Sequence, residues 1–297
     1  MNTSAPDGNQ PLASVATEQP FEFVKLLARE MSAGTVELPS FPEVVLLVQR
    51  VLADEATTPD RVVQVIGTEP ALASRVLRMA NSAALNGSGS SIVELRTAVN
   101  RMGFDMLRSV ALSFAMAQLR HAPQYEPISD ELQSLWQQSM RMGVTAYVVA
   151  RRRTRLNPDS ALLVGILHGV GRLYILARSV EYPDLFADPT GLDSLVAEWH
   201  MNVAKVLLQN WGMAAELVQA VHRYSDPAYS SEGPVTLTDV LAAAALLGAL
   251  SSDRELVGAQ LMESSCTRRL EIDPENLDEI LDEASTQLQS LLDALQG

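Results

Sequence analysis

Three histidines, His168, His200 and His222, fall on three different predicted helices in the second half of the chain. Imidazole nitrogens are common ligands of divalent metals, so converging histidines could form a metal site. Hydrolysis at such a site also needs further ligands, often carboxylates, and an activated water. Gly169 follows His168 and an arginine follows His222, so neither histidine has a carboxylate beside it. We therefore predict no catalytic residue, no bound metal and no cofactor.

Arginines provide a second set of candidate residues. Arg151, Arg152, Arg153 and Arg155 crowd the end of a predicted helix, and Arg172 follows on the next one. Guanidinium groups suit phosphates, so this set could bind a small anion such as a nucleotide. Positive charge at a helix C-terminus is also favourable by about 0.3–1 kcal/mol per residue, which would explain the cluster structurally. Both interpretations stay open at this point.

Composition and motifs exclude several other functions. The net charge of −14 disfavours indiscriminate DNA binding, and the single cysteine excludes an internal disulfide or a multi-cysteine metal site. No phosphate-binding loop, dinucleotide fingerprint, H-E-x-x-H or G-x-S-x-G motif occurs. The longest apolar run, Val240 to Leu250, is too short to span a bilayer, and no basic residue precedes Lys25. We expect a cytoplasmic protein without a membrane segment.

The candidate residues lie on predicted helices. Apolar residues recur at spacings of three and four, aromatic residues make up only 5% of the chain, and no run alternates with period two. The sequence therefore predicts an all-α fold. The expected helices cover residues 21–31, 43–53, 58–66, 69–84, 93–101, 104–120, 130–155, 160–178, 192–210, 214–224, 237–250 and 275–295.

The helix that carries His168 has an unusual glycine content. Gly165, Gly169 and Gly171 lie within the apolar stretch Ser160 to Leu176. Each glycine costs a helix about 1 kcal/mol relative to alanine. We infer that neighbouring helices approach closely here and that His168 faces a crevice.

The ends of the chain differ from its middle. Residues 1–20 are rich in Ser, Thr, Pro, Asn and Gln and are predicted to be a disordered tail. In the last helix, apolar residues step by four and three, which is typical of a coiled-coil seam. They are Leu277, Leu281, Ala284, Leu288, Leu291 and Leu295. This seam could dock on its own domain or form a homodimer. The acidic residues around it are expected to form a solvated face.

A helix pair near the N-terminus, residues 61–66 and 71–84, loosely resembles a helix-turn-helix. Arg75, Arg78 and Asn81 would be its DNA-reading residues. Two packed helices with a short turn are common in all-α proteins. We therefore do not expect nucleic acid as a partner.

Several landmarks occur in an order that resembles the HDOD family, a degenerate branch of the HD metal-dependent phosphohydrolases. The likeness spans residues 38–229. It includes an L-P-x-x-P opening, an A-N-S run, a tryptophan element, a histidine–glycine element and a W-G pair. These are Leu38 to Pro42, Glu69 to Leu72, Arg75 to Ser82, Ile92, Ala98, Val99, Gly103, Leu135, Trp136, Ser139, His168 to Gly171, Trp211 and Gly212.

The chain departs from the pattern of HD enzymes at the metal-ligand positions. Gln138 replaces the histidine of W-x-x-H-S, and Gly169 replaces the aspartate of H-D-x-G. Tyr224 and Ser225 stand where many relatives have paired histidines, whereas His168 and His200 still match. The resemblance thus implies a non-enzymatic protein.

The resemblance also implies a domain layout and a role. We expect an HDOD domain over residues 36–230, with an N-terminal lobe at 21–122, an HD-like lobe at 129–230 and a helical extension at 231–297. Such proteins act in bacterial signal transduction through partner proteins, often near cyclic-dinucleotide, motility or stress pathways. The alternatives are a phosphohydrolase or phosphodiesterase with a site rebuilt from His168, His200 and His222, or a sensor of a small nucleotide-like anion.

Overall fold

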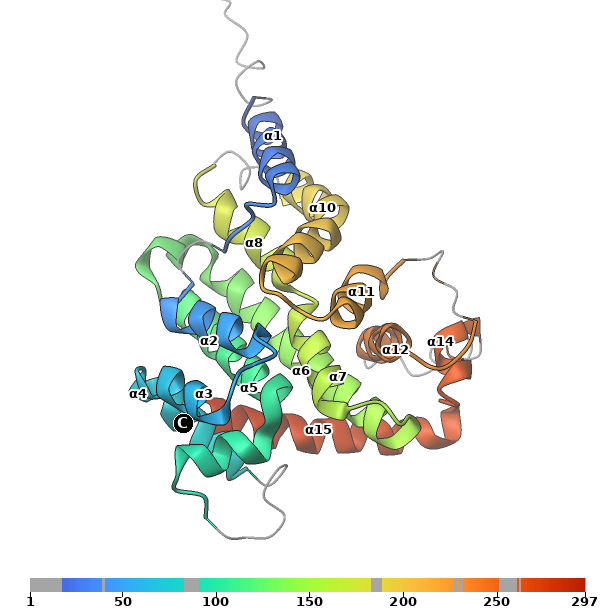
Figure 1. The fold of residues 1–297 in the computed structure, drawn as a ribbon. Coiled ribbons are helices and arrows are strands. Elements are labelled where there is room, and N and C mark those ends of the chain that lie inside the picture. The colour runs from blue at the N-terminus through green and yellow to red at the C-terminus, as the bar shows by residue number, and fades with distance from the viewer. Residues whose placement is uncertain are drawn as a thin grey trace, which may run out of the picture.

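The computed structural model describes residues 18–38, 41–82, 91–182, 189–226, 229, 232–250, 261 and 263–296. These residues form helices and no β-strand, which confirms the predicted all-α class (Figure 1). The helices are α1 (Glu18–Ala33), α2 (Glu43–Ala53), α3 (Pro59–Gly67), α4 (Pro70–Ala80), α5 (Leu95–Arg120), η1 (Pro123–Ile128), α6 (Ser129–Arg153), α7 (Pro158–Leu167), α8 (Val170–Ser179), α10 (Pro189–Asn210), α11 (Ala215–Arg223), α12 (Leu237–Leu250), α14 (Ser265–Arg269) and α15 (Pro274–Gln296).

Most helix boundaries follow the local signals in the sequence. Thr58 caps α3 by accepting from the Arg61 amide, and Asn157 caps α7 by accepting from the Asp159 amide. The predicted interruption between residues 101 and 104 is a kink inside α5, where Gly103 adopts φ 74°. Residues 1–17 of the predicted tail and the loop at 86–90 lie outside the described residues. The helix α1 begins at Glu18, inside the segment that we predicted as tail.

The predicted single helix over residues 160–178 is wrong, because α7 ends at Leu167 and α8 begins at Val170. The His168 Nδ1 lies 2.6 Å from the Gly165 carbonyl oxygen. In a continuous helix that oxygen would accept from the amide of Gly169, so the imidazole competes with the backbone bond. The segment Pro158–Ser179 is long and apolar enough to cross a membrane, but most of it is buried inside the protein, as is typical of core helices.

The predicted close approach at the glycines is confirmed. A Cβ at Gly165 would lie 2.3 Å from the Gly143 Cα, where α7 crosses α6. A Cβ at Gly171 would lie 1.9 Å from the His200 carbonyl oxygen, where α8 crosses α10. Only glycine allows the backbones to meet at these distances. These two crossings fix where His168 and His200 lie.

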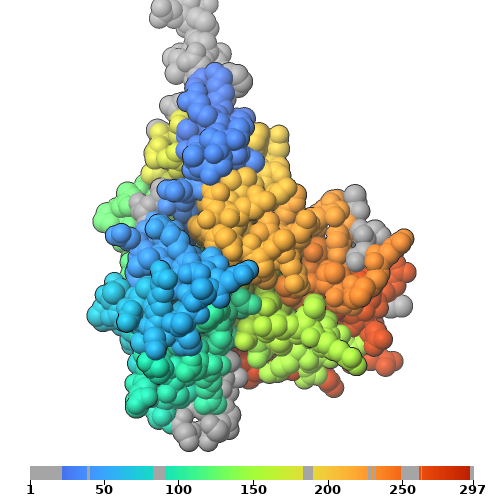
Figure 2. All heavy atoms as spheres, viewed as in Figure 1, coloured from blue at the N-terminus to red at the C-terminus, as the bar shows by residue number. Residues whose placement is uncertain are grey.

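The N-terminal helices pack against the second half of the chain. The Phe41 ring stacks on Trp211 with a centroid separation of 5.8 Å, and Phe23 meets Tyr182 edge-on at 5.2 Å. Asn210 donates to the carbonyl oxygens of Gly34 and Val36. Figure 2 shows the surface of α10 adjoining the N-terminal helices. The family landmarks at positions 41 and 211 therefore meet in space.

The C-terminal helix α15 packs along α4, α5 and α6, as the red helix in Figure 1 shows. Leu277 and Leu291 are buried, and Leu281 and Leu288 are partly buried against the same core. The side chain of Leu295 lies outside the described residues. The seam thus docks on its own chain, the first of the two alternatives above. A homodimer through these leucines stays a prediction.

Ion pairs hold α15 to the end of α6. Arg151 and Arg152 both pair with Glu283, and Arg152 also reaches Glu279 at 2.9 Å. Arg153 donates to the Leu270 carbonyl oxygen at 2.8 Å. The acidic residues that we predicted as a solvated face are therefore partly used as counter-ions for the arginine cluster.

We expect Glu283→Gln to lower the free energy of unfolding by about 1 kcal/mol at low ionic strength. The Glu283 side chain is only 15% exposed and bridges two arginines. Its contribution to stability should therefore exceed that of an ordinary surface ion pair. Urea unfolding should show the loss shrinking at about 1 M salt, where the Debye length is about 3 Å. Glu22→Gln, which removes the exposed partner of Lys25, is the matched control. A loss that is equal at both salt concentrations would contradict this prediction.

Candidate functional site

The turn between α7 and α8 brings together several of the positions named from the sequence. The His168 ring meets the Tyr224 ring edge-on, with centroids 6.0 Å apart and planes at 87°. The pKa of Tyr224 is raised by burial. His200 and Arg172 lie close enough to His168 to act on it electrostatically. We call His168, Arg172, His200 and Tyr224 the histidine cluster.

Both histidines of the cluster are oriented in the same way. The Nδ1 atoms lie 2.6 Å and 2.7 Å from the carbonyl oxygens of Gly165 and Val196, respectively, so each Nδ1–H donates to the backbone. Each Nε2 is thus the second ring nitrogen, which carries the lone pair when the ring is neutral. Burial lowers the pKa of His168 to about 4; the Gly165 carbonyl opposes this shift, and His200 and Arg172 add to it. His168 is thus a neutral imidazole near pH 7.

The position beside His168 carries no carboxylate and is closely packed. A Cβ at Gly169 would lie 2.8 Å from Leu135 Cδ1 and 2.9 Å from Ser139 Oγ. Leu135 and Ser139 are buried and come from α6. An aspartate beside His168 would therefore displace the Leu135 and Ser139 side chains of α6. Gly169 was identified from the sequence as a departure from the HD pattern, but its packing against Leu135 could not be predicted from the sequence.

The residues of the cluster do not fit a divalent metal. Among the described residues, no group of three or more His, Cys, Asp or Glu side chains could hold a metal ion. The convergence of three histidines that the phosphohydrolase alternative requires is not observed in the described residues. His222 Nε2 lies 3.2 Å from Asn202 Oδ1, and His222 lines a groove whose other lining residues are not in the histidine cluster. A hydrolytic metal site needs more ligands than two imidazoles provide.

The other substituted positions do not add a ligand to the histidine cluster. Gln138 is exposed and donates to the Ser134 hydroxyl at 3.2 Å, within its own helix. Ser225 is exposed, and its hydroxyl lies 3.9 Å from Met201 Sδ. Of the substituted positions, Tyr224 is therefore the one that packs on His168.

The predicted anion-binding arginines separate into two groups. Arg151 and Arg152 are paired with α15 carboxylates, and Arg155 is exposed with no ion pair in the part of the chain that the structure describes. Arg172 belongs to the histidine cluster, and its buried Nε has no hydrogen-bond partner among the described residues. The structure thus gives Arg151 and Arg152 a different role, which is to hold α15.

The three residues considered as DNA readers are used within the chain. The Arg75 guanidinium lies over the Phe114 ring at 5.2 Å, and Arg78 Nε donates to the Ala294 carbonyl oxygen at 3.1 Å. Asn81 donates to the Ile92 carbonyl and accepts from the Ile92 amide, each at 2.7 Å. The asparagine of the A-N-S run thus joins the two ends of the segment between residues 81 and 92.

We expect the free energy of unfolding to fall as the pH drops from about 6.5 towards 4. The unfolded chain takes up a proton at His168 near its ordinary pKa of 6.5, whereas the folded chain resists this down to about 4. At about 1.4 kcal/mol per pKa unit, the loss is on the order of 2–3 kcal/mol. Urea unfolding at several pH values measures it. His168→Gln should flatten the profile and His121→Gln should not; an unchanged profile in His168→Gln would refute this assignment.

A family model of the HDOD domain matches residues 38–227. Among solved structures, a "Putative metal-dependent phosphohydrolase" of Shewanella amazonensis SB2B is 26% identical, with a TM-score of 0.72 over 93% of this chain and 100% of that one. A "Putative signal transduction protein" of Marinobacter aquaeolei VT8 is 23% identical, with a TM-score of 0.61 over 95% of this chain and 67% of that one. At 23% identity, the similarity to the Marinobacter aquaeolei protein shows a shared fold alone.

One curated relative also matches. It is an "Uncharacterized protein" of Treponema pallidum (strain Nichols), 22% identical over 223 residues. The match covers 69% of this chain and 41% of that protein. The chain therefore spans less than half the length of this relative.

Proposed function

Because this chain belongs to the HDOD domain family, we propose that it is a non-catalytic module of bacterial signal transduction that acts by binding partner proteins. The observation that carries the proposal is the packing at Gly169, where a Cβ would meet Leu135 at 2.8 Å and Ser139 at 2.9 Å. A phosphohydrolase of the HD type depends on a carboxylate at that position. Here the helical scaffold is kept, the carboxylate is absent, and the side chains of Leu135 and Ser139 pack against its position.

The remaining parts of the site support the same role. Tyr224 packs its ring on His168, and a neutral phenol buried in this way is a poor metal ligand. The two histidines are each fixed by a backbone carbonyl, so they also serve as hydrogen-bonding core residues. We further propose a cytoplasmic role near cyclic-dinucleotide, motility or stress pathways, supported by the family alone.

A metal-dependent phosphohydrolase is the second candidate. It is favoured by the 26% identity to the Shewanella amazonensis protein of that description. The two Nε2 lone pairs of His168 and His200 are also consistent with a remnant of a metal site. This candidate requires a carboxylate ligand beyond those that the described residues bring together.

Metal analysis and turnover assays on the purified full chain separate the two candidates. After incubation with Mn²⁺, Mg²⁺ or Zn²⁺ and desalting, we expect no stoichiometric metal. We also expect no hydrolysis of bis(p-nitrophenyl) phosphate, nucleoside triphosphates or cyclic dinucleotides above background. The matched pair of variants is His168→Ala in the cluster and His222→Ala in the separate groove. Metal-dependent hydrolysis that is lost in His168→Ala but kept in His222→Ala would overturn the proposed function.

A further inference from the structure

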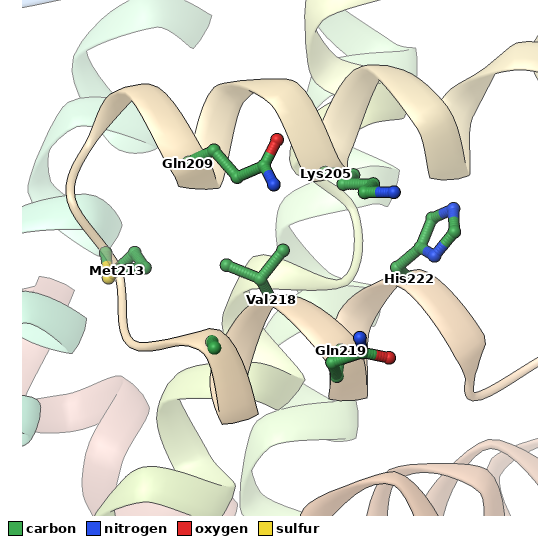
Figure 3. Close-up of a pocket in the computed structure, with 7 residues that line it drawn as sticks. Lys205, Gln209, Met213, Val218, Gln219 and His222 are labelled. Carbon is green, nitrogen blue, oxygen red and sulfur yellow. The ribbon is translucent and has the colours of Figure 1, made fainter.

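A groove of about 290 Å³ runs between α10 and α11, separate from the histidine cluster (Figure 3). The two helices are joined by a turn in which Gly212 adopts φ +64°. Side chains from both helices and from the turn line the groove. They are Lys205, Gln209, Met213, Ala215, Val218, Gln219 and His222. No residue of this groove except His222 was named from the sequence as a candidate.

The groove has an apolar floor. Met213 is 7% exposed and Val218 is 5% exposed, and both belong to the hydrophobic core while also lining the groove. In Figure 3 the Val218 side chain points from α11 towards α10, and Met213 closes one end at the turn. An apolar group that entered the groove would therefore contact the side chains of Val218 and Met213 and shield their remaining exposed surface from water.

The other end of the groove is positively charged. Lys205 and His222 lie side by side there, as Figure 3 shows. Lys205 is one of two lysines in a chain of net charge −14 and is partly buried. Within the described ranges, no carboxylate forms an ion pair with it, whereas the nearby Asp226 is engaged with Arg223 at 3.5 Å. Because Lys205 has no ion pair with a described carboxylate, its ammonium group can pair with an anionic ligand.

His222 places a hydrogen-bond acceptor beside this charge. Its Nε2 lies 3.2 Å from the Asn202 side-chain oxygen, so Nε2–H donates there and Nδ1 of the neutral ring accepts, which leaves Lys205 as the group of this pair that can bind an anion. Burial lowers its pKa, and Lys205 and Arg223 add to this effect while Asp226 opposes it. Gln209 and Gln219 are exposed along the groove. Their amides can donate to an anionic group near Lys205.

We propose that the groove between α10 and α11 binds a small organic anion, an apolar body the size of a medium-length acyl chain or a small aromatic system that carries one carboxylate, sulfonate or phosphate. The anion lies at Lys205 and the apolar body lies over Val218 and Met213. The volume of about 290 Å³ is at the small end of the range for ligand pockets, which favours a small molecule over a partner helix. This ligand site is independent of the catalytic status of the histidine cluster.

Paired fluorescent probes test the proposal on the full-length protein. 8-Anilinonaphthalene-1-sulfonate carries an apolar body and one negative charge, and N-phenyl-1-naphthylamine is the same body without the charge. We expect Lys205→Gln to weaken binding of the sulfonate about tenfold, the loss typical of one charge-assisted hydrogen bond, and to leave the neutral probe unchanged. Lys25→Gln is the matched control, because Lys25 is exposed and pairs with Glu22 at 2.8 Å.

Competition experiments then define the ligand class. Octanoate should displace the sulfonate probe, whereas octylamine of the same chain length should not. Val218→Glu introduces a negative charge into the floor and should abolish binding of the sulfonate, with circular dichroism confirming that the variant is folded. Equal binding of the sulfonate by wild type and Lys205→Gln, or failure of both probes to bind wild type, would overturn the proposal. Neither result bears on whether the histidine cluster hydrolyses phosphoesters.

Discussion

Replacing Gly171 with alanine is expected to lower the free energy of unfolding by about 3 kcal/mol, the upper end of the usual cost of overpacking. The added Cβ would lie 1.9 Å from the His200 carbonyl oxygen and 2.9 Å from the Ala204 amide nitrogen. Both atoms belong to the backbone of α10, so no side chain can rotate away. The helix α8 would have to move from α10, and His200 would move with it. Urea unfolding followed by circular dichroism measures the loss.

Gly67→Ala is the matched control for this substitution. Gly67 ends α3, and a Cβ there would meet nothing within 4 Å. Alanine should stabilise this position by about 0.4–1 kcal/mol, because the unfolded chain loses freedom. Gly165→Ala should resemble Gly171→Ala, since its Cβ would lie 2.3 Å from the Gly143 Cα. If Gly171→Ala changed the free energy of unfolding no more than Gly67→Ala does, then α8 and α10 would not cross as described.

Replacing Arg269 with methionine is expected to cost about 3 kcal/mol, the lower end of the range for breaking a buried ion pair. Asp239 is 1% exposed, and Arg269 Nε donates to its carboxylate at 3.1 Å. Arg269 also donates to the carbonyl oxygens of Gly233 and Pro234. The variant would leave the Asp239 carboxylate buried without its counter-ion. Thermal unfolding and urea unfolding both measure the effect.

Two further variants test whether the loss of stability comes from the ion pair of Asp239 and Arg269. Arg268→Met changes the neighbouring arginine of α14, which is exposed, and should alter stability by less than about 0.5 kcal/mol. The double variant Asp239→Asn with Arg269→Met should be more stable than Arg269→Met alone, because asparagine removes the buried charge. Equal losses for Arg268→Met and Arg269→Met would contradict the ion pair.

These two contacts matter for the proposed function because they hold different parts of the scaffold. The crossing at Gly171 positions His200 beside His168, inside the segment that matches the HDOD domain. The pair of Asp239 and Arg269 joins α12 to α14, beyond that segment. A binding module without turnover depends on keeping its shape. Variants that loosen either contact should therefore be examined for partner binding as well as stability.

Local features of the sequence determined most of the helices. The ends of α2 agree with the prediction, since the apolar spacing and the preceding Pro42 act within one or two turns. The family likeness named His168, His200 and Tyr224 as positions of the degenerate HD site, and the rings of His168 and Tyr224 meet in the structure. The break between α7 and α8 was missed because a side chain, His168, takes the backbone acceptor, which apolar spacing does not reveal.

The all-helical class, the close helix crossings at glycine and the departures of the chain from an HD metal site could all be predicted from the sequence. The residues that pack at those places are known only from the folded chain. Leu135 and Ser139 close the space beside Gly169, and α15 supplies Glu283 to Arg151. Helix formation depends on residues within about four positions of each other. The filling of a gap or the pairing of a charge depends on residues that the folded chain brings together from far apart.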